Sequence, residues 1–218
     1  MTQPHTTVYV VDDDAAMRSS LEFMVTGTDL NVRTYTSAEE FLAEVKPQTR
    51  GCLILDLRMP GMSGHELHRQ LNTRGVKLPV IVLTGHGDVP TAVGAMKLGA
   101  FDFLTKPVNR DVLLQRVRAA LEADQARDRQ GEETADFERR LATLTPRELE
   151  VMDHVARGQA NKEIARQLGV AERTVANHRA HLSHKLGVGN AADLVRKLGL
   201  IGRLGPHRDE ASAASPRG

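Results

Sequence analysis

Residues 51–64, GCLILDLRMPGMSG, place Asp56 at the end of an apolar run and follow it with a Pro-Gly turn. A short, continuous apolar run is typical of a strand that is buried on both faces of a sheet. Further strand-like runs occur at 7–11, 31–35, 80–84 and 101–105, and helical patterns at 15–26, 37–45, 64–71, 90–99 and 110–123 separate or follow them. This alternation predicts an α/β fold, a doubly wound five-stranded parallel sheet of flavodoxin-like type with helices on both faces.

The remainder of the chain carries helical patterns only. Thr145, Pro146 and Glu148 form the start signal of a helix that Gly158 ends, and further helical patterns cover 161–169, 172–187 and 190–200. We therefore predict a first domain over 1–121, a charged and partly helical linker over 122–142, a small all-α helix-turn-helix domain over 143–204, and a disordered tail over 205–218.

Charge and cysteine content indicate the environment and one class of partner. Residues 145–204 hold ten Lys and Arg against six Asp and Glu, whereas residues 1–121 are balanced at thirteen of each. A basic excess in the small domain favours a polyanionic partner, although an ordinary solvated surface fits equally well. The single cysteine, Cys52, and the absence of a membrane-length apolar run or signal peptide predict a soluble cytoplasmic protein.

Polar residues follow four of the predicted strands. Asp12 and Asp13 follow the first, Asp56 ends the third, Thr84 ends the fourth and Lys106 follows the fifth. In a 2-1-3-4-5 strand order, the first and third strands are neighbours, so their acids converge at the carboxyl edge of the sheet. Asp14, next in the chain, is more simply explained as a helix N-cap.

Converging carboxylates repel one another unless a cation lies among them, and Mg²⁺ is the cation that such oxygen ligands suit. Lys106 and Thr84 can neutralise and hydrogen-bond phosphoryl oxygens. The pattern therefore predicts that Asp56 is a nucleophile that accepts a phosphoryl group in a Mg²⁺-dependent reaction.

The motifs VVDDD, LDLRMPGMSG and VLTGHGDVPTAVGAMKLGAFDFLTKP together resemble the receiver domain of bacterial response regulators, with the last closest to the FixJ-like group. The resemblance covers residues 6–121. It implies that Asp56 is the phosphoacceptor, that Thr84, Lys106 and the aromatic Phe103 are switch residues, and that the Lys106–Pro107 peptide bond is cis. It also implies that Mg²⁺ is arranged by Asp12, Asp13, Asp56 and the backbone carbonyl of Arg58.

The second and third helices of the small domain have the spacing of a helix-turn-helix, with the second of the pair as recognition helix. Its polar side would present Arg173, Thr174, Asn177, His178, His181 and Lys185. Asn can pair with adenine in the major groove, and the basic residues can hold phosphates. A protein-binding helical bundle with a solvated polar face is the alternative.

Residues 143–198 resemble the DNA-binding domain of the LuxR/NarL type. By that resemblance Ala176, Asn177 and Ala180 face bases, whereas Lys162, Thr174, His178 and Lys185 face the DNA backbone. Two residues depart from the pattern. Ala171 replaces the usual serine cap of the recognition helix, and Ala176 stands where relatives often carry a charge, which leaves direct readout largely to Asn177.

The sequence thus predicts a phosphorylation-controlled transcriptional regulator whose partners are a sensor histidine kinase, operator DNA and a second copy of itself. The dimer would form through residues 90–99, the fifth strand and the last receiver helix. Two alternatives remain: a DNA-binding protein with a phosphorylation-independent receiver, and an Asp-based phosphohydrolase. Such hydrolases carry an acid two residues after the nucleophile, where this chain has Arg58.

Overall fold

The protein contains two compact units, Met1–Arg129 and Gln130–Gly218, whose boundary falls inside one helix. The computed structural model describes residues 7–85 and 89–203, so the tail predicted over 205–218 lies outside the described residues. Among the described residues, no helix combines the length and the apolar character that crossing a membrane requires.

The first unit is built on a parallel sheet of five strands in the order β2-β1-β3-β4-β5. The strands are β1 Thr7–Val11, β2 Asn31–Tyr35, β3 Cys52–Asp56, β4 Val80–Thr84 and β5 Asp102–Thr105. Every residue of β3 and β4 is buried, as expected for central strands covered on both faces. The predicted fold class and strand order are confirmed.

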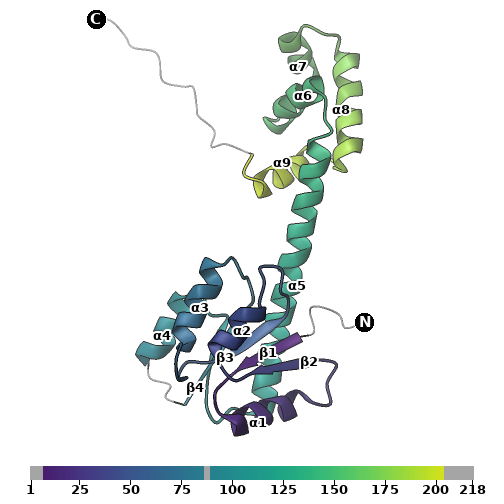
Figure 1. Cartoon of the computed structure of the whole chain (residues 1–218). Coiled ribbons are helices and arrows are strands. Elements are labelled where there is room, and N and C mark those ends of the chain that lie inside the picture. The colour runs from purple at the N-terminus through teal and green to yellow at the C-terminus, as the bar shows by residue number, and fades with distance from the viewer. Residues whose placement is uncertain (1–6, 86–88, 204–218) are drawn as a thin grey trace, which may run out of the picture. The chain divides into compact units, whose positions relative to one another are not determined.

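Helices cover the two faces of this sheet in separate groups (Figure 1). On one face, α2 Ala38–Glu44, α3 Gly64–Thr73 and α4 Val89–Lys97 supply core residues such as Phe41 and Leu67. On the other face, α1 Ala15–Val25 and α5 Arg110–Leu141 supply Leu21 and Val117. Strand alternation divides β1 accordingly, because Val8 and Val10 join the α1 and α5 cluster while Tyr9 and Val11 join the other.

Helix α5 runs without interruption from Arg110 to Leu141, through the segment predicted as a linker and through Gly131. Its middle part belongs to the first unit because polar contacts fasten it there. Asp124 is buried and accepts a hydrogen bond from the Gly51 N–H at 2.9 Å, and Asp128 forms an ion pair with Arg50 at 2.6 Å. The segment predicted as a charged, partly helical linker is thus helical as far as Leu141 and packs against the first unit.

The second unit contains the end of α5 and the helices α6 Pro146–Ala156, α7 Asn161–Leu168, α8 Glu172–Leu186 and α9 Ala191–Leu200. Thr145 and Glu148 form the predicted capping box at the start of α6. The core joins Phe137 and Leu141 of α5 to apolar residues of the other four helices. The four predicted helices of the small domain are therefore present, and α5 adds a fifth element to their core.

Candidate functional site

The acids predicted to converge do meet at the carboxyl edge of the first unit's sheet. Asp12 directly follows β1 and Asp56 ends β3, and these strands pair in a register that sets Val11 opposite Leu55. Ligand atoms of Asp12, Asp13 and Asp56 all lie within 4.8 Å of one another. Asp12 and Asp56 are buried, at 1% and 8% exposed, whereas Asp13 is open to solvent. The cluster is therefore anchored in the core and accessible from one side.

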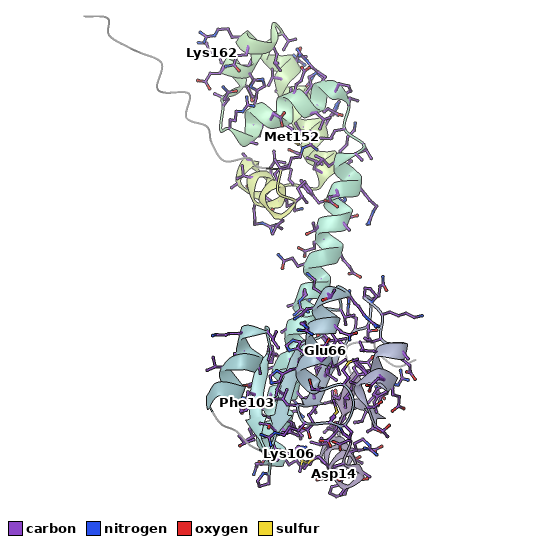
Figure 2. All side chains as sticks on the ribbon, turned by 60° about the vertical axis from the view of Figure 1, so that its left-hand side comes forward. Asp14, Glu66, Phe103, Lys106, Met152 and Lys162 are labelled. Carbon is purple, nitrogen blue, oxygen red and sulfur yellow. The ribbon has the colours of Figure 1, made fainter. Side chains whose placement is uncertain are left out.

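Lys106 supplies a positive charge to this cluster. Its Nζ lies 2.7 Å from Asp12 Oδ2 and 2.6 Å from Asp56 Oδ2. The backbone places it there, because the Lys106 N–H donates to the Thr84 carbonyl at 2.8 Å and the Lys106–Pro107 bond is cis, as the resemblance implied. Figure 2 shows Lys106 at the same end of the first unit as Asp14, which follows the acid pair.

Burial and hydrogen bonding act in opposite directions on these groups. Burial raises the pKa of Asp12 above its ordinary value, although the hydrogen bond from Lys106 opposes the effect. Burial by itself would lower the pKa of Lys106, but the hydrogen bonds to Asp12 and Asp56 outweigh it and raise the pKa. Lys106 is thus a permanent cation at neutral pH.

The donor set fits a hard divalent cation. Three carboxylates share this small space with one ammonium group, which leaves two negative charges unbalanced. Carboxylate oxygens are the ligands that Mg²⁺ prefers, and the exposed Asp13 leaves a path from solvent. Backbone donors hold the acids in place: Asp14 N–H donates to Asp12 Oδ1 at 2.9 Å and Arg58 N–H to Asp56 Oδ1 at 3.1 Å.

Asp14 has a separate role. Its carboxylate accepts a hydrogen bond from the Ala16 N–H at 2.8 Å and another from the Met17 N–H, so it caps the start of α1. The N-cap interpretation of Asp14 is confirmed, and the residue is not part of the carboxylate cluster that Asp12, Asp13 and Asp56 form.

Gly64 is a site residue that the sequence pattern did not reveal. It begins α3, and its N–H donates to the Leu57 carbonyl at 3.1 Å. A Cβ added at Gly64 would lie 2.1 Å from the Asp56 carbonyl oxygen and 2.8 Å from the Leu57 Cα. The start of α3 therefore packs directly on the backbone of Asp56. The sequence signal was the glycine itself, which follows the serine that caps the helix.

The predicted switch residues lie along β4 and β5. Thr84 is 1% exposed at the end of β4, where it pairs in register with Thr105. Phe103 lies on β5 and packs, partly buried, against the core beneath α2, α3 and α4. In Figure 2, Phe103 and Lys106 lie in the same part of the first unit, with Phe103 above Lys106 in this view. The roles of Thr84 and Phe103 in switching stay predictions.

The second unit presents the predicted DNA-contacting residues mostly at its surface. Arg173, Ala176, Asn177, Ala180 and His181 of α8 are exposed, as is Lys162 of α7, while Thr174 and His178 are half-buried. Lys162 extends outward at one end of this unit (Figure 2). Ala171 precedes α8 as its N-cap and makes no side-chain cap hydrogen bond, as its side chain dictates. The contacts with DNA themselves remain predictions.

Lys185, predicted to contact DNA, forms an ion pair inside the second unit. Its Nζ donates to Glu148 Oε2 at 2.7 Å, and Glu148 is buried at 4% exposed. The same carboxylate accepts the Thr145 N–H at 2.8 Å. Lys185 thus completes a network that fastens α8 to the start of α6. This internal bond competes with any phosphate for its ammonium group.

Comparison with known proteins accounts for both units. The model of the response regulator receiver domain matches residues 8–118, and that of the luxR family of bacterial regulatory proteins matches residues 142–198. The chain belongs to the bacterial response regulators. FixJ of Azorhizobium caulinodans is 44% identical over 93% of this chain and 95% of its own length. TodT of Pseudomonas putida is 39% identical over 90% of this chain and 86% of its own.

Solved structures agree with this assignment. The response regulator StyR is 40% identical, with a TM-score of 0.75, over 88% of this chain and 98% of its own. Full-length FixJ from B. japonicum is 37% identical, with a TM-score of 0.56, over 93% of this chain and 100% of its own. The relatives that we name are regulators, which favours a regulatory over a hydrolytic role for this response regulator.

Proposed function

We propose that this response regulator is a transcriptional regulator that binds DNA under the control of phosphorylation at Asp56. The observation that carries the proposal is the position of Lys106, held between Asp12 and Asp56 beside the exposed Asp13, in a chain that also carries a luxR-type domain. A carboxylate with an adjacent fixed cation and an open side is suited to accepting an anionic group from solvent.

In the proposed reaction, an oxygen of the Asp56 carboxylate attacks the phosphorus of a donor. A bond forms between that oxygen and phosphorus, the bond from phosphorus to the donor breaks, and the donor atom keeps the electron pair. Lys106 is already 2.6 Å from Asp56 Oδ2, so its ammonium can follow the negative charge onto a phosphoryl oxygen. The natural donor that we propose is a sensor histidine kinase.

Asp12, Asp13, Asp56 and the Arg58 carbonyl would hold the Mg²⁺ ion that fits this site. When bound, Mg²⁺ neutralises the excess negative charge and stabilises the charge that develops on the transferring group. The protein's own contribution is to hold Asp12 and Asp56 rigidly, through β1, β3 and the backbone donors of Asp14 and Arg58.

Phosphorylation of Asp56 is proposed to promote the association of two copies of the chain. A phosphoryl group on Asp56 would draw the Thr84 hydroxyl towards it, and Phe103 would turn into the space released. The affected surface includes α4 and the start of α5, where Val93, Met96 and Val112 are 45%, 51% and 41% exposed. Apolar side chains exposed at this level suit burial in a homodimer.

We further propose that α8 enters the major groove of operator DNA. Asn177 would then read a base, and Lys162 and Arg173 would bind phosphates on either side. A single short helix makes few base contacts, so pairing two copies on one operator supplies the affinity that one copy lacks. The cytoplasm is the compartment proposed for this activity, because DNA and a reducing environment are both found there.

The phosphoacceptor assignment is tested by incubating the full chain with acetyl phosphate and Mg²⁺ and measuring the intact mass. The wild-type protein should gain one phosphoryl group, whereas Asp56→Asn should gain none because the amide is not a nucleophile. Asp111→Asn, a matched change at an exposed acid of α5, should behave as wild type. Uptake by Asp56→Asn at the wild-type rate would show that the acceptor is another residue.

A further inference from the structure

The first unit contains a hollow of about 420 Å³ at the edge of the sheet opposite the carboxylate cluster. Leu78 and Pro79 line it immediately before β4, and Phe101 lines it immediately before β5. The acids lie at the carboxyl ends of the strands, whereas this hollow lies at the amino ends, so the two places are distinct. Its volume falls within the range of small-molecule sites.

His68 of α3 faces this hollow. The residue is 4% exposed, yet among the described residues its ring nitrogens form no hydrogen bond. No fully enclosed side-chain nitrogen or oxygen in the described part of the chain lacks a partner, so the unpaired ring nitrogens of His68 are not fully enclosed. Burial, together with the neighbouring His65, lowers the pKa of His68 and so favours the neutral ring. A neutral imidazole offers one donor and one acceptor to whatever enters.

Two basic residues line the hollow. Lys77 is exposed, and Arg127 reaches the hollow from α5, where its guanidinium donates to the Lys77 carbonyl. Arg127 is held in place because Asp124, 3.9 Å from its Nη1, also accepts the Gly51 N–H and so fastens this turn of α5 to the first unit. The part of α5 beyond residue 121 therefore completes the hollow with a positive charge.

Part of the lining is apolar. Val76, Leu78 and Pro79 are buried, and Phe101 is half-buried. Apolar residues that share one hollow with two basic residues and an unpaired imidazole suit a ligand with an apolar body and one anionic group. We propose that this hollow binds a small organic carboxylate with an apolar ring, whose carboxylate pairs with Lys77 and Arg127 and accepts a hydrogen bond from His68. This binding requires neither phosphorylation nor DNA.

The test is an NMR titration of the full chain with benzoate, followed through the ring resonances of His68, which are assigned by comparison with His68→Asn. Benzoate should shift these resonances in a saturable manner at roughly millimolar concentration. Benzyl alcohol keeps the ring without the charge, and acetate keeps the charge without the ring. Each should bind about tenfold more weakly, because each lacks one of the two contacts.

Lys77→Gln removes one of these two basic residues and should weaken benzoate binding about tenfold, whereas Lys97→Gln removes a nearby exposed cation that does not line the hollow and should have no effect. His68 resonances that do not shift even at benzoate concentrations well above the millimolar range would overturn the proposal. Affinity for benzyl alcohol equal to that for benzoate would overturn it too. Unchanged benzoate affinity in Lys77→Gln would overturn it as well. Since the assay contains no phosphoryl donor, its outcome is independent of the phosphorylation of Asp56.

Discussion

Gly64 sets the distance between α3 and the backbone of Asp56. Because a Cβ there would lie 2.1 Å from the Asp56 carbonyl oxygen, Gly64→Ala must displace the phosphoacceptor strand or the helix. We expect the first unit to lose about 1–3 kcal/mol of unfolding free energy, as in other overpacked sites. Tyrosine fluorescence during urea unfolding measures this, because Tyr9 and Tyr35 are both in the first unit and the chain has no Trp.

Gly94 of α4 offers the matched control. A Cβ at that position would meet only His65 Cε1 at 3.8 Å, an ordinary contact. Gly94→Ala should therefore raise the unfolding free energy by up to about 1 kcal/mol, because alanine favours a helix interior. Equal effects of the two substitutions would contradict the role given to Gly64.

Glu148 makes the stability of the second unit depend on pH. Hydrogen bonds from Lys185 and from the Thr145 backbone lower the pKa of Glu148 to about 2 from an ordinary value of 4.5. A depressed acid pKa stabilises the folded state fully above the unfolded value, so this contribution declines as the pH falls from about 4.5 to about 2. Hydrogen exchange of amides in α6 and α8, followed across this range, should show the loss.

Lys185→Ala removes the main donor to Glu148, so it should both flatten that pH dependence and cost about 1–3 kcal/mol at neutral pH. A variant that keeps the wild-type pH profile would show that the pair does not stabilise the unit. The substitution also changes the stability of α8, and for this reason it is a poor probe of DNA contacts.

The sequence indicated the acids, Thr84 and Lys106 because strand ends are readable from hydrophobic runs, and parallel strands bring their ends to one edge. It did not indicate the partner of Lys185 or the close approach of Gly64. Both depend on which residues of different helices and strands meet in three dimensions. The sequence around Lys185 does not indicate that its partner is the buried Glu148.

At the scale of helices, α8 begins at a residue that cannot cap it. Ala171→Ser should add a side-chain acceptor for the first-turn N–H groups and stabilise the helix by about 1 kcal/mol. Hydrogen exchange of the first-turn amides measures the effect. The same change in the exposed helix interior, Ala180→Ser, should instead be slightly destabilising. Equal protection in the two variants would mean that the start of α8 is stabilised by other contacts.

If α8 recognises bases, substitutions of base-contacting and phosphate-contacting residues should change DNA binding in different ways. Asn177→Ala should cost about 1–3 kcal/mol of binding to the preferred duplex and relax the preference at one base pair. Lys162→Ala should weaken binding to all duplexes about equally and reduce the salt dependence. Gel-shift competition with single-base variants distinguishes the two. Unaltered affinity and preference in Asn177→Ala would exclude the proposed placement of this helix.

Helix α5 extends further, and packs more closely, than its composition indicates. Residues 122–142 are rich in charge, and that composition predicts a charged, partly helical linker. In the structure Asp124 is buried against Gly51, and Phe137 and Leu141 lie in the core of the second unit. A few apolar residues are enough to hold a helix in place when polar contacts add to their packing. Such polar contacts leave no periodic pattern in the sequence.

For the whole molecule, the central expectation is that phosphorylation joins two copies of the chain. Beryllofluoride with Mg²⁺ mimics the phosphoryl group and should shift the sedimenting species of the wild-type chain from monomer towards dimer. Met96→Glu places a charge on the proposed α4 surface and should prevent the shift, whereas Phe23→Glu, at an exposed apolar residue of α1, should not. A shift that survives Met96→Glu unchanged would place the dimer interface elsewhere.

Both domains could be predicted from sequence because each has strong internal patterns, alternating strands and helices in the first and a series of short helices separated by glycine-containing turns in the second. The family comparisons confirm that interpretation over residues 8–118 and 142–198. The boundary between the units was harder to predict, because α5 carries one regular helix across it and through Gly131.

Control of DNA binding through Asp56 is tested most directly by measuring affinity for one duplex, selected by the protein itself from a random pool. Fluorescence anisotropy would compare the wild-type chain and Asp56→Asn, each with and without beryllofluoride and Mg²⁺. We expect beryllofluoride to raise the affinity of the wild-type chain at least tenfold, about the gain expected when a second copy binds beside the first, and to leave Asp56→Asn unchanged. Equal wild-type affinities with and without beryllofluoride, or an equal rise in Asp56→Asn, would contradict it.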